Sequence, residues 1–195
     1  MANSNAPFGL IPRRLRNGSP WMGPMRTYFV PASDATAIYV GDPVIIAGDG
    51  DTAGVPTVTK ATAATGRITG VCVGLRPGGN GTLIPPRYRA ASVAEYILVA
   101  DDPNILYEIQ EDSVGGALAA TNIGQNASFI AGTGSTTTGQ SGAMLQSSTA
   151  ATTNTLQLRI IGLEHRADNV IGNYAKWLVA INLPTETGAA GSTGV

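Results

Sequence analysis

The chain has 195 residues, of which 43% are hydrophobic and only 13% are charged, and its net charge at neutral pH is −1. This length suits one domain with a substantial core. The charged fraction is about half the average for globular proteins, and a soluble monomer usually carries more charge. We therefore expect much of the surface to face other protein, in a homo-oligomer for which a homo-trimer is favoured and a homo-dimer stays open.

The single cysteine, Cys72, cannot form an internal disulfide and fits a reducing cytosol. The first twenty residues lack the apolar centre of a signal peptide. No apolar run approaches the roughly 20 residues that are needed to span a bilayer. We therefore expect synthesis in the cytosol and no membrane partner.

Residues 1–24 are expected to form an extended arm, because four prolines and three glycines prevent a long helix. The arm also carries large apolar side chains, in which disordered tails are poor. Docking of this arm on another protein is the favoured interpretation, and wrapping around its own domain is the alternative. The candidate partner-binding residues are Phe8, Arg13, Arg14, Arg16 and Trp21.

Charge is unevenly spread along the sequence. Residues 1–27 contain four arginines and no acid, whereas the remainder has eight basic and 13 acidic residues. Arginine and aromatic residues often dominate protein interfaces, which favours a protein partner. Three clustered arginines without a lysine cluster or a basic domain are a weak signal for nucleic acid, so we do not expect nucleic acid as a partner.

After the arm, short segments rich in Val, Ile, Thr and aromatic residues alternate with Gly and Pro turns, which predicts strands. The predicted strands cover residues 26–31, 37–40, 44–47, 55–62, 67–75, 125–130, 156–163 and 176–183. No segment of ten or more residues has the 3.6-residue period of an amphipathic helix. We therefore expect a single all-β domain over residues 25–184, followed by a C-terminal tail at 185–195.

The segment from residue 95 to residue 110 is expected to be the centre of this domain. Residues 96–100 are apolar throughout, and residues 105–110 alternate with a period of two. Between them, residues 101–104 (Asp-Asp-Pro-Asn) have the composition of a turn. The pattern predicts a β-hairpin.

Catalytic and metal-binding patterns were sought along the whole chain. The acidic loop at residues 48–51 lacks the late glutamate of a calcium-binding loop and is expected to be a hairpin turn. His165 is the only histidine, and no Gly-x-Ser-x-Gly elbow accompanies it. One cysteine and one histidine cannot supply a zinc site. We therefore expect no enzyme activity, no cofactor and no metal.

Four short motifs resemble those of cement, or decoration, proteins, which are small structural proteins of tailed-bacteriophage heads. The resemblance extends over roughly residues 3–183. The motifs lie at residues 5–14 (Asn-Ala-Pro-Phe-Gly-Leu-Ile-Pro-Arg-Arg), 40–44 (Val-Gly-Asp-Pro-Val), 70–74 (Gly-Val-Cys-Val-Gly) and 98–104 (Leu-Val-Ala-Asp-Asp-Pro-Asn).

The resemblance implies a β-rich protein of the virion, made in the host bacterial cytoplasm. It implies binding to the outer surface of the head as a homo-trimer or homo-dimer, where the protein clamps neighbouring subunits of the major capsid protein. It implies no catalytic residues. Such proteins have jelly-roll or β-tulip cores, and the length of this chain favours a jelly-roll-like sandwich or barrel over the β-tulip. The alternative function is a carbohydrate-binding or adhesin-like jelly-roll module of a phage surface or tail protein.

Overall fold

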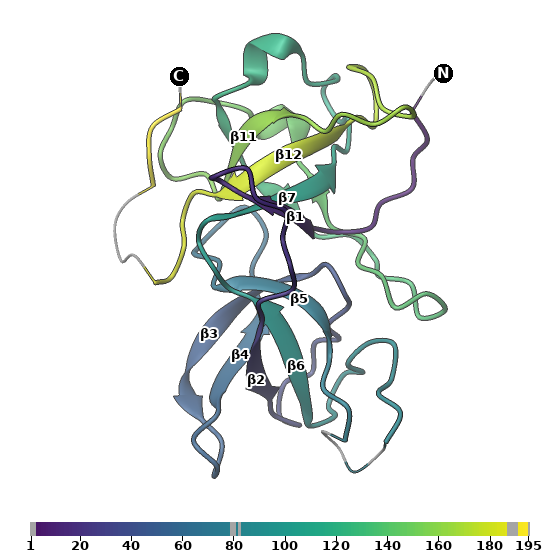
Figure 1. The fold of residues 1–195 in the computed structure, drawn as a ribbon, viewed down its shortest axis with the longest axis vertical. Helices are drawn as coiled ribbons and strands as arrows, with labels where there is room; N and C mark the ends of the chain where they lie inside the picture. Colours follow the sequence, from purple (N-terminus) through teal and green to yellow (C-terminus); the bar gives the residue numbers. More distant parts are fainter. Residues whose placement is uncertain (1–2, 79–80, 82, 187–190, 195) are drawn as a thin grey trace.

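The computed structural model describes residues 3–78, 81, 83–186 and 191–194. The fold is all-β, as predicted, with sheets packed as a sandwich (Figure 1). Helical structure in the described residues is limited to two short 3-10 turns, η1 (Ala120–Asn122) and η2 (Ser147–Thr149).

Five consecutive strands close into a barrel, which forms the lower half of the molecule in Figure 1. They are β2 (Arg26–Val30), β3 (Pro43–Gly50), β4 (Pro56–Lys60), β5 (Gly70–Leu75) and β6 (Glu95–Ala100). The strand order is β2-β4-β3-β5-β6, and β2 closes the barrel by pairing with both β6 and β4. Its interior is a cluster of apolar side chains: Tyr28, Val30, Ile38, Val44, Val58, Cys72, Leu75, Ile97 and Val99.

A five-stranded antiparallel sheet forms the upper half, in the order β1-β7-β12-β11-β8 (Figure 1). Its strands are β1 (Ile11–Leu15), β7 (Ile105–Gln110), β8 (Asn126–Ala127), β11 (Leu158–Leu163) and β12 (Lys176–Ile181). A separate pair consists of β9 (Phe129–Ile130) and β10 (Met144–Leu145). Because β1 precedes the barrel and β7 follows it, the barrel is inserted between two neighbouring strands of the sheet.

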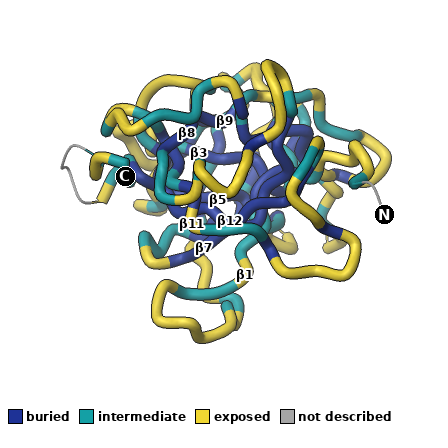
Figure 2. The backbone as a smooth tube through the Cα atoms, turned by 90° about the horizontal axis from the view of Figure 1, so that it is seen from above, coloured by how far each residue is buried: buried dark blue, intermediate teal, exposed yellow. Residues whose placement is uncertain are grey.

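The main hydrophobic core joins the sheet to the barrel. On β7, Ile105, Tyr107 and Ile109 enter this core together, as their period-two spacing predicted. Val71 of β5 and Ala100 of β6 pack in the same cluster, so the core continues from one half into the other. Figure 2 shows the buried strands gathered in the middle, with exposed loops around them.

The predicted hairpin at residues 95–110 is wrong in its pairing. Both strands and the turn at 101–104 exist, but β6 pairs with β2 and β5, whereas β7 pairs with β1 and β12. The turn therefore carries the chain out of the barrel and into the sheet. Tyr107 Oη donates a hydrogen bond of 2.9 Å to the carbonyl oxygen of Ala100 across this corner. Turn residues specify a change of direction, and not which strands will pair.

The other predicted strands occur close to their expected positions, with two corrections. Residues 37–40 make only isolated bridges through Ile38 and Val40, and residues 125–130 are divided between β8 and β9. In the C-terminal tail, residues 187–190 and 195 lie outside the described residues. The Gly194 amide donates to Thr152, and the Ser192 carbonyl accepts from the Asn126 side chain.

Candidate protein-binding surface

The N-terminal segment is part of the sheet through β1. This strand pairs with β7, and the adjacent Leu10 side chain is only 1% exposed in the core. The outer edge of β1 is covered by its own chain, because the amides of Trp21 and Leu15 bond to the carbonyls of Arg13 and Ser19. For residues 10–15, the geometry is therefore the wrapped one, and the edge is protected from pairing with another strand.

Two of the three clustered arginines have acidic partners within the chain. The guanidinium of Arg13 contacts the carboxylate of Glu108, whose side chain is 0% exposed. Arg14 donates from one nitrogen, Nη2, to both oxygens of Glu164, each at 2.8 Å. About 40% of each arginine side chain stays exposed. Both ion pairs link β1 to other parts of the chain. These two arginines therefore contribute to the fold, whether or not they also bind a partner.

Glu108 is shared with a second arginine, Arg166, at 2.8 Å. Arg166 also bonds to Asp168, and hydrogen bonds to Asp168 and Glu108 raise the pKa of Arg166. The carboxylate of Glu108 thus lies between two guanidinium groups from distant parts of the chain. Such pairing offsets the large cost of burying a charge.

Trp21 lies beside an apolar groove with a volume of about 250 Å³. The groove is lined by Leu10, Ile11, Pro12, Trp21, Met25, Val40, Cys72 and Val73. Met25 is 43% exposed at its rim, and the neighbouring Met22 is 85% exposed. The indole Nε1 of Trp21 is buried and has no hydrogen-bond acceptor among the described residues. We call Trp21, Met22, Met25 and this groove the methionine surface.

Sequence reasoning named Trp21 but missed the two methionines. The chain contains four methionines, and two of them stand three residues apart in Met22-Gly-Pro-Met25. That clustering, in a segment where glycine and proline prevent burial in a helix, was the available signal. Phe8, also named from the sequence, is half-buried and does not line the groove.

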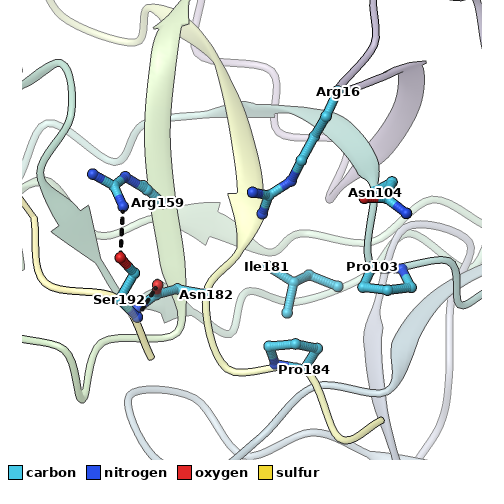
Figure 3. Close-up of a pocket in the computed structure, with 8 residues that line it drawn as sticks. All are labelled: Arg16, Pro103, Asn104, Arg159, Ile181, Asn182, Pro184 and Ser192. Atoms are coloured by element: carbon cyan, nitrogen blue, oxygen red, sulfur yellow. Dashed lines mark hydrogen bonds between the residues drawn. The ribbon is translucent and has the colours of Figure 1, made fainter. Parts of the chain in front are cut away.

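Arg16 lies apart from its two neighbours, in a cavity of about 340 Å³ near the 101–104 corner (Figure 3). Its backbone amide donates to the carbonyl of Asn104 at 2.8 Å, and its side chain is exposed. The structure therefore separates the five predicted binding residues. Arg13 and Arg14 form ion pairs, Trp21 lies at the methionine surface, Phe8 is half-buried away from the groove, and Arg16 lines the cavity.

The four motifs noted in the sequence meet where the barrel joins the sheet. The Leu10 amide bonds to the Gly41 carbonyl, and a Cβ on Gly9 or Gly41 would collide with the backbone of the other segment. Gly70 approaches the carbonyl of Ala100 in the same way. Gly9 and Gly41 also have positive φ angles of 75° and 95°. Glycine is therefore needed at these positions, because the backbones of two segments pass too close together for a side chain.

The predicted hairpin between β3 and β4 is present, but its turn lies later than predicted: residues 48–50 are the end of β3, and the turn is formed by residues 51–55. Asp51 accepts hydrogen bonds from the amides of Ala53 and Val55, so its carboxylate stabilises the turn. Within the described residues, no group of three or more His, Cys, Asp or Glu side chains could hold a metal ion. Burial raises the pKa of the Cys72 thiol to about 12, which makes it a poor nucleophile.

Comparisons with protein-family models, with curated proteins and with solved structures found no match to this chain. No helix in the described part of the chain has the length and apolar character needed to cross a membrane. Inference of function therefore depends on the chemistry of the surface.

Proposed function

We propose that this protein is a structural virion protein of the cement kind, which binds the outer surface of a tailed-phage head and clamps neighbouring major capsid protein subunits. The observation that carries the proposal is the methionine surface. Met22 and Met25 are 85% and 43% exposed beside Trp21 and an apolar groove. Tryptophan, methionine and arginine are the residue types enriched in protein interfaces.

Two further observations support a binding role. Only 13% of the residues are charged, as expected of a surface that is covered in an assembly. The half-exposed Arg13 and Arg14 lie on β1, close in the chain to the methionine surface, and could form the polar rim of the same interface. A homo-trimer remains the favoured assembly, because a closed ring would present several copies of this surface to the capsid lattice.

A cement protein would act by mass action. A ligand that binds the assembled shell but not the separated subunits shifts the balance toward the shell. Each contact can be weak, since attachment at two neighbouring subunits raises the effective concentration of the second contact without any new interaction. The proposed function therefore requires a modest surface in many copies rather than a deep site.

The proposal is tested by co-sedimentation with heads of the phage that carries this gene, prepared without the protein. The double variant Met22→Ser/Met25→Ser should bind about tenfold more weakly or worse, because hot spots at interfaces cost more than about 1.4 kcal/mol each. Val170→Ser, also at an exposed apolar residue (49%), is the matched control and should bind normally.

If the double variant bound heads as tightly as the unmodified protein, the methionine surface would be excluded as the surface that contacts the head. Failure of the unmodified protein to sediment with heads, together with specific signals on a glycan array, would replace the cement function with the carbohydrate-binding alternative.

A further inference from the structure

The cavity that contains Arg16 is assembled from four separate parts of the chain. Its described lining comprises Arg16, Pro103, Asn104, Arg159, Ile181, Asn182, Pro184 and Ser192. These residues come from the position just after β1, the corner between β6 and β7, strand β11, and the end of β12 with the segment that follows it. Figure 3 shows the guanidinium of Arg16 extending over Ile181 toward the side where Arg159 and Ser192 lie.

The described lining of this cavity contains two arginines and no acidic residue. Among the described residues, no carboxylate lies within 4.0 Å of the guanidinium of either Arg16 or Arg159. Arg13, Arg14 and Arg166, by contrast, all have carboxylate partners. Like charges that share one cavity repel each other, so an anion bound between them would be stabilised.

The polar groups of the cavity are already oriented. Arg159 Nη1 donates to Ser192 Oγ at 3.0 Å, and the Ser192 amide donates to the Asn182 side chain at 3.0 Å. Asn182 Nδ2 in turn donates to the carbonyl of Leu156 at 2.9 Å. This chain of hydrogen bonds fixes Arg159 through one nitrogen and leaves its other donors for a ligand. Pre-ordered donors lower the cost of binding.

The surroundings limit the kind of anion. A neighbouring cavity shares Pro103 and is lined by three acidic residues, Asp101, Asp102 and Glu186, against one arginine, Arg26, so a polyanion that reached it would meet a net negative charge. The apolar floor of the Arg16 cavity, at Ile181, Pro103 and Pro184, suits a short hydrocarbon stem. No aromatic ring on which a sugar could stack is present in the described lining. A glutamate side chain meets all three conditions.

We propose that the cavity between Arg16 and Arg159 binds a single carboxylate, presented by a glutamate side chain of a partner protein. A guanidinium presents paired donors that match the two oxygens of a carboxylate. The cavity volume of about 340 Å³ is at the lower end of the range for ligand sites, which suits one side chain. This proposal requires only a partner protein with an accessible glutamate. It does not depend on the proposed cement function.

The test uses the full chain with labelled arginines and follows the Nε–Hε signals of Arg16 and Arg159 by NMR. The probe is N-acetyl-glutamate methylamide, titrated at constant ionic strength, and its neutral glutamine counterpart is the control ligand. We expect saturable shifts of both signals with a dissociation constant on the order of millimolar, and none with the glutamine compound. Arg16→Gln and Arg159→Gln should each weaken binding about tenfold, because hydrogen bonds to charged groups are worth roughly 1.5–3 kcal/mol.

Arg87→Gln is the matched control variant, because Arg87 is also exposed and bonds to a neutral carbonyl, that of Thr137, outside the cavity. It should leave binding unchanged. If the glutamate compound shifted the NMR signals of Arg87 and Arg16 equally, the ion pairing would be unspecific and the proposed site would be wrong. A parallel titration with glucuronic acid tests the other source of a carboxylate: tenfold tighter binding than the glutamate compound would overturn the assignment to a protein side chain. Thermal melts confirm that each variant is folded.

Discussion

The barrel and the five-stranded sheet differ in what their strands enclose. The barrel joins five strands that follow one another in the sequence, around a cluster of apolar side chains. The sheet joins segments as far apart as Arg13 and Glu108, separated by 95 residues, and buries charged side chains on its strands. Burial of apolar surface stabilises the first region, whereas the second also depends on ion pairs and hydrogen bonds. The barrel also contains a buried carboxyl group on its strands, that of Glu95, whose pKa is raised by burial, so both regions should respond to pH.

The barrel region also buries charged residues, namely Asp42, Arg89 and Glu95, and Arg89 allows the largest test. Arg89 is 0% exposed, and its guanidinium donates to the backbone carbonyls of Val93, Thr36 and Pro31, each at 2.7 Å. Arg89→Met should lower the free energy of unfolding by about 3 to 5 kcal/mol, because three buried carbonyls would lose their donor. Urea unfolding measures the loss. A change below about 1 kcal/mol would mean that water replaces the guanidinium at little cost.

A smaller effect is expected from the ion pairs of the sheet. Glu108→Gln keeps the shape of a buried side chain but removes the charge shared by Arg13 and Arg166. The expected loss is about 1 to 3 kcal/mol, because both arginines are partly exposed and can turn to water. Asp168→Asn, at the exposed partner of Arg166, is the matched control and should cost less than about 0.5 kcal/mol. Similar losses in the two variants would contradict a special role for the buried carboxylate.

The smallest expected effect concerns Glu111, for which the direction of the change in stability with pH is defined. Burial raises the pKa of Glu111 above its ordinary value of 4.5, even though Leu118, Trp177 and Ser113 donate hydrogen bonds to it. The folded state therefore holds this proton more tightly than the unfolded state does. Stability from this group is fully present below pH 4.5 and is lost as the pH rises through the raised pKa.

Glu111→Gln should remove that dependence. The unfolding free energy of the unmodified protein, minus that of the variant, should fall as the pH rises from below 4.5 and then become constant. Urea unfolding at a series of pH values measures this difference, in which the other carboxylates cancel. A difference that rises with pH would mean that the hydrogen bonds outweigh burial.

The positions of most strands were accessible to sequence reasoning in both regions, but their pairing was not. Alternation and turn composition identify strands such as β4 and β7, because both patterns are local. The pairing of β1 with β7 has no local signature: Ile11–Leu15 contains a proline and two arginines, and its partner strand is remote. For the same reason the hairpin at 95–110 was predicted with strands that in fact belong to different sheets.

Among the candidate binding residues, too, local features were visible in the sequence and distant partners were not. Trp21 was named as a candidate because a large aromatic residue in a proline-rich segment is conspicuous, and its binding role stays a prediction. Arg13 and Arg14 were named for their charge, but their partners Glu108 and Glu164 are distant in the sequence, so their internal pairing could not be foreseen. Arg159 was overlooked because an arginine on the polar side of an alternating strand is usually solvated. Only the fold brings it into the cavity with Arg16.

A cement function is tested most directly by the temperature at which phage heads release their DNA, measured with a DNA-binding dye. Heads that carry the protein should release DNA at a higher temperature than heads that lack it, because the bound copies favour the closed shell. Adding back the unmodified protein should restore the higher temperature, and adding back Met22→Ser/Met25→Ser should restore it only in part. Equal release temperatures with and without saturating protein would contradict the cement function.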